Sequence, residues 1–209
     1  ETPYDRTIFL DTDTYVTDDL SAAFEVLAEF DIAVAHNSSP EGRDTHEMQS
    51  IPETFPEYNT GVLAYRSTDR TDAFLESWLQ AYEAADEHPH DQPSFRDTLY
   101  RSNLRVATLP PEYNCLFRYP GYVVGPVRVF HGRLQSVDGP GAGQYFDIET
   151  AVERINATTA NRVFTQLGGI SVYTNRKDTL LGRARMSARQ HGYRHLLREG
   201  ITELRDGLR

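Results

Sequence analysis

Apolar residues in the first two thirds of the chain fall into short runs and into longer patterns with helical spacing. Short runs are typical of buried strands, and they lie at 8–10, 31–36, 60–66, 104–110 and 126–132. Helical spacing predicts helices over 17–30 and 67–87, and a shorter helix over 90–102. Thr17 and Asp91 are the predicted N-caps of the first and third helices. The order of elements predicts an α/β fold with a sheet of mixed strand directions.

Two long segments do not fit the strand and helix pattern of the rest. Residues 37–58 are polar and rich in Pro, Ser and Gly, which predicts a loop. A loop of more than about 15 residues in a compact domain is usually functional or disordered, so we expect a lid or an acceptor surface here. From Phe146 onward the pattern favours helices. We therefore expect a sheet domain over 1–146 and a basic helical extension over 147–209.

The charge balance excludes one class of partner. The 209 residues carry a formal net charge of −10, whereas general nucleic-acid binding needs a basic surface to displace counterions from phosphates. Of the 21 basic residues, Lys177 alone is a lysine, and an acidic, arginine-rich surface is similar to that of salt-adapted proteins. Because Cys115 is the single cysteine, no intrachain disulfide can form, and we expect a cytoplasmic, reducing environment.

The charge of the chain reverses toward its end. Residues 176–209 hold nine basic and four acidic side chains. Two interpretations stay open: an arginine-rich helical cap on an acidic domain, or a peripheral contact with an anionic membrane face or a partner.

The first apolar run ends directly in two carboxylates, Asp11 and Asp13. Residues two apart in a strand point to the same face, so the two side chains can converge. Converging carboxylates repel each other unless a cation lies between them. Three interpretations compete: a solvated turn, a phosphotransferase of the haloacid dehalogenase type with Asp11 as nucleophile, and a site for Mg²⁺ or Mn²⁺ with a diphosphate. The second expects a small residue where Tyr15 stands, and a lysine downstream within the sheet domain.

Four further polar segments follow strands or begin helices, and each has a simple structural interpretation as a turn or an N-cap. Imidazole is a usual third ligand for Mn²⁺, and a glycine after it lets the backbone approach a ligand. A strand entrance with an amide and a bare backbone can bind a hydroxyl-rich ligand. The candidates are His131 and Gly132, then Asn59, Thr60 and Gly61, then Asp91 and Gln92, and finally Asn114.

Taken in order, the segments FLDTDTYV, YNTGVLAYR, HDQPSF, LPPEYN and FHG resemble the GT-A nucleotide-sugar glycosyltransferases. The resemblance is closest to family eight, the glycogenin and lipopolysaccharide galactosyltransferase type, and it covers residues 7–133. Five motifs in register make coincidence a poor explanation.

The resemblance implies a divalent metal ion, Mn²⁺ or Mg²⁺, on the diphosphate of a sugar-nucleotide donor. Asp11 and Asp13 match the D-x-D pair that holds this ion, and His131 matches the third ligand. Asp11 and Gly132 would also border the donor. Arg133 is the candidate replacement for a lysine that touches the diphosphate in the family, because the segment HGRLQS has a shortened His-Gly spacing and no lysine.

The resemblance also implies a sugar pocket. Asn59, Thr60 and Gly61 match the N-x-G-V segment that lines it, and Asn114 would add a polar contact. Asp91 and Gln92 match the D-Q pair, whose carboxylate grips sugar hydroxyls and whose amide lies near the reacting carbon. The strands that bind the nucleotide base in this family would lie upstream of Glu1, so we expect the chain to hold the metal and sugar half of a site.

The function expected on this basis is transfer of a hexose from a nucleotide-diphosphate donor to an acceptor hydroxyl of a glycan, a lipid or a protein. The family retains the anomeric configuration. A phosphohydrolase that uses Asp11 as nucleophile and a non-catalytic sugar-binding fragment remain as alternatives.

Overall fold

The computed structural model describes residues 2–38, 51–85, 90–117, 119–132, 148–159, 161–164, 173–174 and 188. The chain divides into two compact units, Glu1–Val172 and Tyr173–Arg209. Strand β10 (Tyr173–Thr174) belongs to the second unit. Most of the predicted helical extension, including its basic part, lies outside the described residues, so its helicity and its membrane contact stay predictions. Among the described residues, we find no helix with the length and apolar character to cross a membrane.

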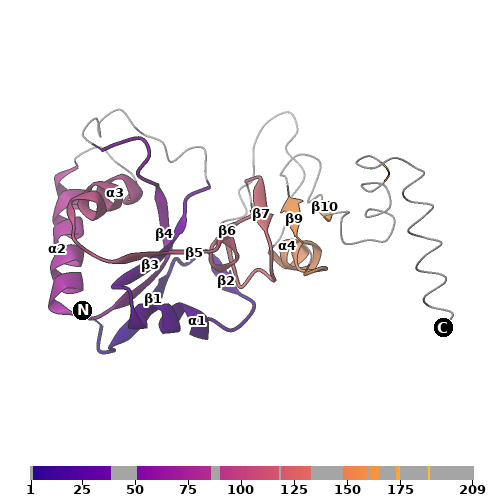
Figure 1. Ribbon diagram of the computed structural model, residues 1–209, viewed down its shortest axis with the longest axis horizontal. Coiled ribbons are helices and arrows are strands. Elements are labelled where there is room, and N and C mark those ends of the chain that lie inside the picture. The colour runs from indigo at the N-terminus through magenta and orange to yellow at the C-terminus, as the bar shows by residue number, and fades with distance from the viewer. Residues whose placement is uncertain are drawn as a thin grey trace. The chain divides into compact units, whose positions relative to one another are not determined.

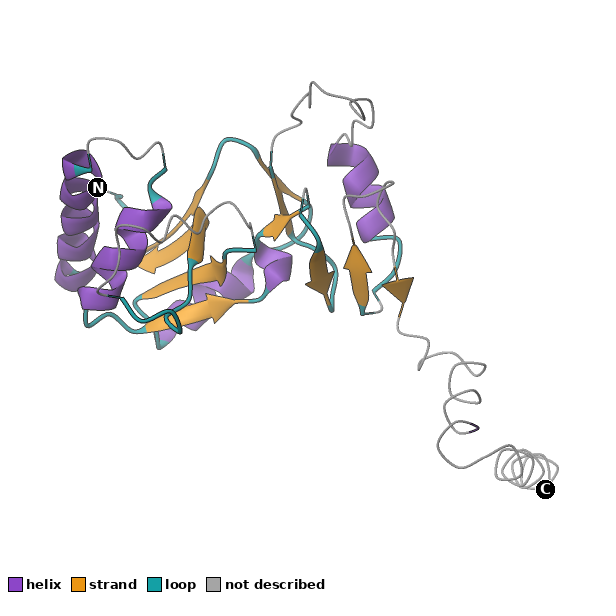
Figure 2. Ribbon diagram, turned by 90° about the horizontal axis from the view of Figure 1, so that it is seen from above, coloured by secondary structure: helices purple, strands orange, loops and turns teal. Residues whose placement is uncertain are grey.

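A four-stranded sheet forms the centre of the first unit (Figures 1 and 2). Its order is β1 (Arg6–Leu10), β4 (Tyr58–Arg66), β3 (Ile32–His36) and β5 (Val106–Leu109). Strand β4 is antiparallel to both of its neighbours, whereas β3 and β5 are parallel. The ends of β1, β3 and β5 therefore meet the start of β4 at one edge of the sheet. This arrangement confirms the predicted α/β fold with mixed strand directions.

Strand β3 shows why helices cover both faces of this sheet. Its four residues Ile32 to Ala35 are fully buried and alternate between two cores. Ala33 and Ala35 pack with α1 (Ser21–Glu25) and the following 3₁₀ helix, Val26–Ala28. Ile32 and Val34 pack with α2 (Asp69–Ala84) and α3 (Gln92–Arg101). Because side chains alternate in a strand, one short apolar run supplies both layers.

Strand β4 is irregular where it enters the sheet. Val34 pairs with Leu63, but the next residue, Ala35, pairs with Asn59. The three residues between these partners, 60–62, are therefore unopposed by β3. Bulges of this kind re-aim side chains near functional sites. Here the bulge releases Thr60 and Gly61 at the edge where β1 and β3 end.

A second sheet has the order β2 (Thr14–Val16), β8 (Val129–His131) and β6 (Cys115–Leu116). Strand β2 lies next to the segment for which the sequence predicts a helix starting at Thr17, and the helix begins only at Ser21. The predicted N-cap role of Thr17 is wrong. Its hydroxyl donates to the Val127 carbonyl at 2.6 Å, and its N–H donates to the Arg128 carbonyl at 2.8 Å. The hydroxyl thus fixes the neighbouring sheet instead of a helix end.

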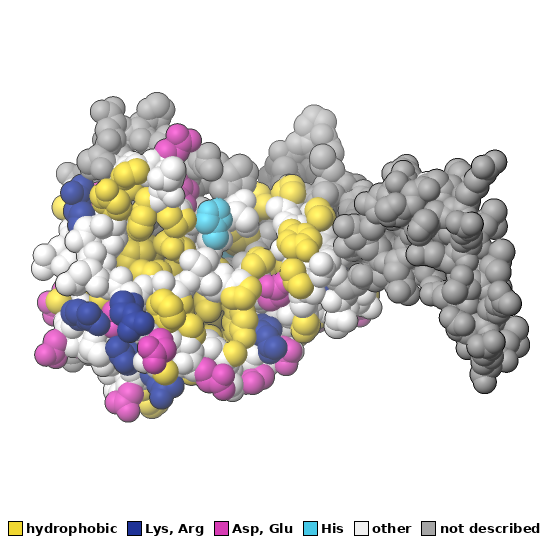
Figure 3. Space-filling model, viewed as in Figure 1, with side chains coloured by type: hydrophobic (Ala, Val, Ile, Leu, Met, Phe, Trp, Pro, Cys, Tyr) yellow, Lys and Arg dark blue, Asp and Glu magenta, His cyan; other side chains and the backbone are white. Residues whose placement is uncertain are grey.

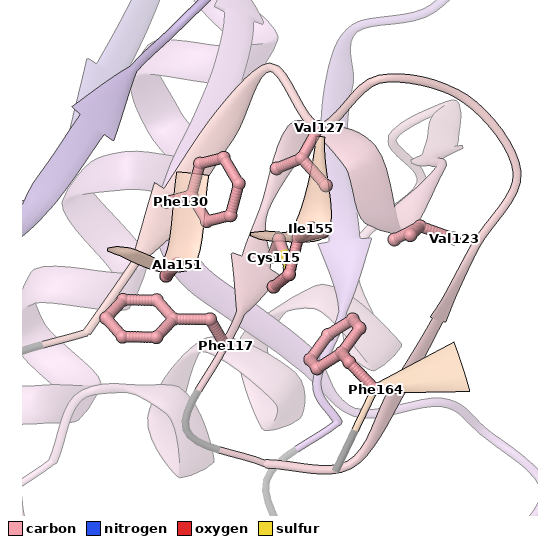
Figure 4. Packing of buried hydrophobic residues seen from close by; sticks show 8 residues of the cluster. All are labelled: Cys115, Phe117, Val123, Val127, Phe130, Ala151, Ile155 and Phe164. Carbon is pink, nitrogen blue, oxygen red and sulfur yellow. The ribbon is translucent and has the colours of Figure 1, made fainter. Parts of the chain in front are cut away.

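A third element pair, β7 (Gly121–Val123) and β9 (Arg162–Phe164), is antiparallel. With α4 (Ile148–Ile155) it encloses an apolar core. Figure 4 shows that core, made of Cys115, Phe117, Val123, Val127, Phe130, Ala151, Ile155 and Phe164. Helix α4 agrees with the helical pattern predicted after Phe146, but β9 does not, because Val163 and its neighbours pair with β7 instead. Beside this core, burial lowers the pKa of the Arg162 guanidinium, an effect that the nearby Cys115 and Glu112 oppose.

Candidate metal centre

Backbone hydrogen bonds fix the positions of Asp11 and Asp13. The Asp11 N–H donates to the Gly61 carbonyl at 2.9 Å, and the Asp11 carbonyl accepts from the N–H and the hydroxyl of Thr14. This turn joins β1 to β2, in which Thr14 pairs with His131 of β8. The Gly132 N–H donates to the Asp13 carbonyl at 3.1 Å. Two sheets therefore deliver the acidic pair and His131 to the same place.

The three side chains converge as the D-x-D interpretation requires. His131 Nε2 lies 3.5 Å from Asp11 Oδ2 and 3.3 Å from Asp13 Oδ1. One ligand atom from each residue lies within 4.8 Å of the others. The His131 side chain is 8% exposed, whereas Asp11 and Asp13 are 42% and 23% exposed. The imidazole is therefore the buried side of the cluster, and the two carboxylates form an exposed side that solvent or a ligand can reach.

The backbone of Gly61 lies directly against His131 and Asp11 in this cluster. A Cβ atom built on Gly61 would lie 2.1 Å from His131 Cε1 and 2.9 Å from Asp11 Oδ2. Such distances are far inside van der Waals contact, and both partners are held by backbone hydrogen bonds or burial. Close approach of backbone to a functional group requires glycine at this position.

Two asparagines lie behind the imidazole. Asn114 Oδ1 lies 2.9 Å from His131 Nδ1, and Asn114 Nδ2 donates to Asn59 Oδ1 at 2.8 Å. Asn59 Oδ1 also accepts from the Gly61 N–H at 3.1 Å. Asn59 and Asn114 are 6% and 4% exposed. Their amide groups thus face the protein interior and the metal-centre histidine.

Asp91 occupies the position before α3, as predicted, but it does not cap the helix with its side chain. Instead, its Oδ1 accepts from the Thr60 hydroxyl at 3.2 Å. Its carbonyl accepts from Ser94 Oγ at 2.8 Å and from Trp78 Nε1 at 3.2 Å. Sequence reasoning missed Trp78, although a tryptophan on an apolar helix face needs a partner for its indole N–H.

The structure brings most of the predicted site residues together. Gln92 Oε1 lies 3.5 Å from Asn59 Nδ2, at the limit of a hydrogen bond. Gly132 has a φ of 132°, a conformation that favours glycine and lets its N–H reach Asp13. Arg133 and most of the predicted lid, residues 39–50, lie outside the described part of the chain.

The donor set fits a hard divalent cation. Carboxylate oxygens suit Mg²⁺ and Mn²⁺, and an added imidazole favours Mn²⁺ over Mg²⁺. A cation between Asp11 and Asp13 would also relieve the repulsion of their charges. The imidazole lies so close to the backbone of Gly61 that no Cβ fits between them, so the fold itself sets the position of the ring.

Comparisons with known proteins identify the family of this chain. A family profile described as nucleotide-diphospho-sugar transferase matches residues 6–129. A search of curated proteins gave no match. Among solved structures, the galactosyltransferase LgtC with donor and acceptor sugar analogs is 18% identical, with a TM-score of 0.49, over 75% of this chain and 61% of that one.

Two further solved structures are similar at the same level. The glycosyltransferase GlyE of Streptococcus pneumoniae TIGR4 is 21% identical, with a TM-score of 0.45, over 65% of this chain and 35% of that one. Mouse xyloside xylosyltransferase 1 is 22% identical, with a TM-score of 0.42, over 63% of this chain and 58% of that one. The chain thus spans less than two thirds of the length of each of these proteins.

The family match covers more than half of the chain and includes the acidic pair, the Asn59–Gly61 segment, Asp91 and Asn114. It favours sugar transfer over the phosphohydrolase interpretation of Asp11. The chain belongs to the nucleotide-diphospho-sugar transferase family of glycosyltransferases.

Proposed function

We propose that this protein transfers a hexose from a nucleotide-diphosphate donor to an acceptor hydroxyl, and that it requires a divalent cation, Mn²⁺ or Mg²⁺. One observation supports this most. Two consecutive residues of β4 contact both the candidate sugar-binding carboxylate and the candidate metal ligands. Thr60 donates to Asp91, and Gly61 lies against His131. The candidate metal ligands and the candidate sugar-binding carboxylate therefore adjoin one short, bulged stretch of backbone.

The physical problem of the reaction is charge. Breaking the bond between sugar and diphosphate leaves negative charge on the phosphate and positive character on the ring. A bound Mn²⁺ or Mg²⁺ would stabilise the diphosphate as a Lewis acid. Asp11, Asp13 and His131 would hold it, with Gly132 and Arg133 bordering the phosphates. Placing two carboxylates on an open side leaves room there for diphosphate oxygens.

The sugar would lie beside Asp91. An ionised carboxylate accepts hydrogen bonds from hydroxyls and favours positive character on a nearby ring. Ser94 and Trp78 fix the backbone carbonyl of Asp91, and the Thr60 hydroxyl donates to its carboxylate, so the side chain is positioned before a ligand arrives. Gln92 would place its amide near the reacting carbon. We further propose retention of the anomeric configuration, as in the family-eight enzymes that the motifs resemble.

A thermal-shift screen of sugar nucleotides tests this function. A donor present at a concentration of about 100 times its Kd stabilises the folded state by about 2.7 kcal/mol. For a chain of this size, that raises the unfolding temperature by roughly 5–10 °C. We expect a shift that needs Mn²⁺ and a sugar nucleotide together. Consumption of that donor, followed with glycan and lipid acceptors, then tests transfer.

Two variants make the screen specific. Asp13→Ala should remove the Mn²⁺-dependent part of the shift, because one of three ligands is lost. Glu76→Ala, which changes an exposed carboxylate on α2, should leave it unchanged. If Asp13→Ala and the wild-type protein give equal Mn²⁺-dependent shifts, the metal assignment fails.

A further inference from the structure

The orientation of both site asparagines can be deduced from a single backbone group. A backbone N–H can only donate, and the Gly61 N–H lies 3.1 Å from the Asn59 side-chain amide. The atom that faces it must therefore be the oxygen, Oδ1. This removes the usual ambiguity between oxygen and nitrogen in an asparagine side chain.

The same reasoning passes from Asn59 to Asn114. The Asn59 oxygen lies 2.8 Å from the Asn114 amide group, so the nearer atom of Asn114 must be its donor, Nδ2. Its other end, Oδ1, then faces His131 Nδ1 at 2.9 Å. Because that oxygen can only accept, Nδ1 must carry a hydrogen.

The reverse arrangement has a clear cost. If Nδ1 carried no hydrogen, two acceptors would face each other, or Asn114 would have to turn over. Turning Asn114 would place its oxygen against the Asn59 oxygen, and turning Asn59 as well would leave the Gly61 N–H facing an NH₂ group. All three residues are buried, where such mismatches are costly.

We propose that Asn59 and Asn114 are positioning residues that keep the hydrogen of His131 on Nδ1 and so present the Nε2 lone pair to the cation. Nε2 is the atom that faces Asp11 and Asp13. This inference rests on the metal centre of the proposed function. It gives the two asparagines a role behind the imidazole, beyond the sugar contacts that the sequence predicts for them.

The amide chemistry suits this task. A carboxylate could also accept from Nδ1, but it would add a third negative charge beside Asp11 and Asp13. A neutral amide fixes the tautomer without that repulsion. The orientation of the two amides is set by the backbone, because the chain of hydrogen bonds starts at the Gly61 N–H. Gly61 is also the residue that lies against the imidazole.

The first test measures the hydrogen directly in the full, metal-free chain. ¹⁵N NMR of labelled histidine at about pH 8 distinguishes a ring nitrogen that carries hydrogen from one that does not. The His131 signal is identified by its loss in His131→Gln. We expect hydrogen on Nδ1 of His131. A bare Nδ1 in the wild-type protein overturns the proposal, whatever the variants do.

The second test uses Mn²⁺ alone as the probe, with affinity measured by calorimetry. Asn114→Leu removes the acceptor, and we expect a loss of Mn²⁺ affinity of about 10- to 100-fold and a weakened preference for hydrogen on Nδ1. Asn114→Asp restores an acceptor and should restore hydrogen on Nδ1. The matched control is Asn156→Leu, because the Asn156 amide likewise holds two groups, the N–H and the carbonyl of Val127, but lies outside the site.

The outcomes separate this inference from the proposed function. Unchanged Mn²⁺ affinity and unchanged Nδ1–H in a folded Asn114→Leu overturn the positioning role. Mn²⁺ binding by a wild-type protein with a bare Nδ1 overturns this inference alone. Absence of Mn²⁺ binding with hydrogen on Nδ1 overturns the metal centre, and the role of presenting Nε2 with it.

Discussion

Carboxylates at the two ends of the central sheet have opposite environments. At the site end, where β1 and β3 finish, Asp11 and Asp13 face an imidazole and stay partly exposed. At the other end, where β3 begins, Asp31 is fully buried and held by cations. Carboxylates at the two ends of one sheet thus have opposite surroundings, an open side at the proposed metal centre and cationic partners at the other end.

The Asp31 end is saturated with donors. Asp31 accepts from Arg66 at 3.2 Å, from Arg70 at 2.6 Å and from the Arg105 N–H at 2.8 Å. Burial raises the pKa of Asp31, but these donors outweigh it and hold the pKa below its ordinary value. The group ties the end of β4 and the start of α2 to the start of β3. In Figure 3, dark blue Lys and Arg side chains lie next to magenta Asp and Glu side chains at the lower left of the view.

This difference gives a criterion that distinguishes a carboxylate that stabilises the fold from one that is available to bind a ligand. A structural carboxylate has its oxygens paired within the fold, and its removal leaves the groups that donate to it without their acceptor. A carboxylate that binds a ligand keeps an exposed side, and hydrogen bonds of its backbone fix its position. Variants at the two ends should therefore change different observables.

The largest effect is expected from Asp31→Leu. It leaves the Arg105 N–H without its buried acceptor, whereas Arg66 and Arg70 are 36% and 49% exposed and regain water. We therefore expect a loss of about 2–3 kcal/mol in the free energy of unfolding. Urea unfolding measures it. The control is Glu29→Leu, since Glu29 pairs with Arg105 at 3.6 Å while 76% exposed, and its loss should cost less than about 1 kcal/mol. Equal costs at the two positions would refute the contrast.

Gly61→Ala should break the site end. The added Cβ meets His131 Cε1 at 2.1 Å, so overpacking should lower the free energy of unfolding by about 1–3 kcal/mol and Mn²⁺ affinity by at least about tenfold. Gly125→Ala is the matched control, because a Cβ there meets nothing within 4 Å. Calorimetry with Mn²⁺ on the folded variants measures the effect. Normal Mn²⁺ affinity in Gly61→Ala would contradict the geometry.

The lowered pKa of Asp31 predicts a pH dependence confined to the structural end. Its contribution to stability is complete above the unfolded pKa of about 3.9 and is lost as pH falls through the lower folded pKa. We compare the free energies of unfolding of the wild-type protein and Asp31→Asn from pH 7 to pH 3. Their difference should be constant above about pH 5 and shrink below about pH 4. A difference that grows on acidification would reverse the sign of the shift.

The smallest effect is expected from Thr68→Ala. Thr68 caps α2 by accepting from the Thr71 N–H at 3.3 Å, and losing such a cap costs about 1 kcal/mol. Mn²⁺ affinity should stay unchanged, because the cap lies at the structural end. Ser77→Ala, inside the same helix, should change stability by less than about 0.5 kcal/mol. Thermal unfolding compares the two, and a weakened Mn²⁺ site in Thr68→Ala would show that the ends are coupled.

Periodicity predicted the central sheet and its large helices well. The apolar runs that became β3, β4 and β8 are mostly buried and β5 is half-buried, and α2 has its apolar residues at helical spacing. The prediction of a buried strand at 8–10 is wrong, because β1 is an edge strand without a buried residue and its Phe9 is 49% exposed. The short strands β2, β6, β7 and β9 were missed. Two or three residues carry no period, and such strands form only because a distant partner is present. Thr17 illustrates this, since its hydrogen bonds cross to Val127 and Arg128.

The candidate site was predictable as a set of residues but not as a set of contacts. Short motifs flagged Asp11, Asp13 and His131, and the structure brings these three together. What each polar group faces depends on tertiary packing. Asp91 illustrates this, because its carboxylate has a helix start within reach and bonds Thr60 instead. The inward orientation of Asn114 also depends on partners far away in sequence.

The bulge in β4 has a consequence for how this sequence can vary. Residues 60–62 are unopposed by β3, and β4 pairs with β1 only from Val62 onward, so the position of Gly61 depends on the number of residues between Asn59 and Leu63. Inserting or deleting one residue there would either move Gly61 away from Asp11 and His131 or shift the following residues to the opposite face of the sheet. At this edge, chain length is therefore as constrained as side-chain identity, and change should arrive by substitution rather than by insertion or deletion.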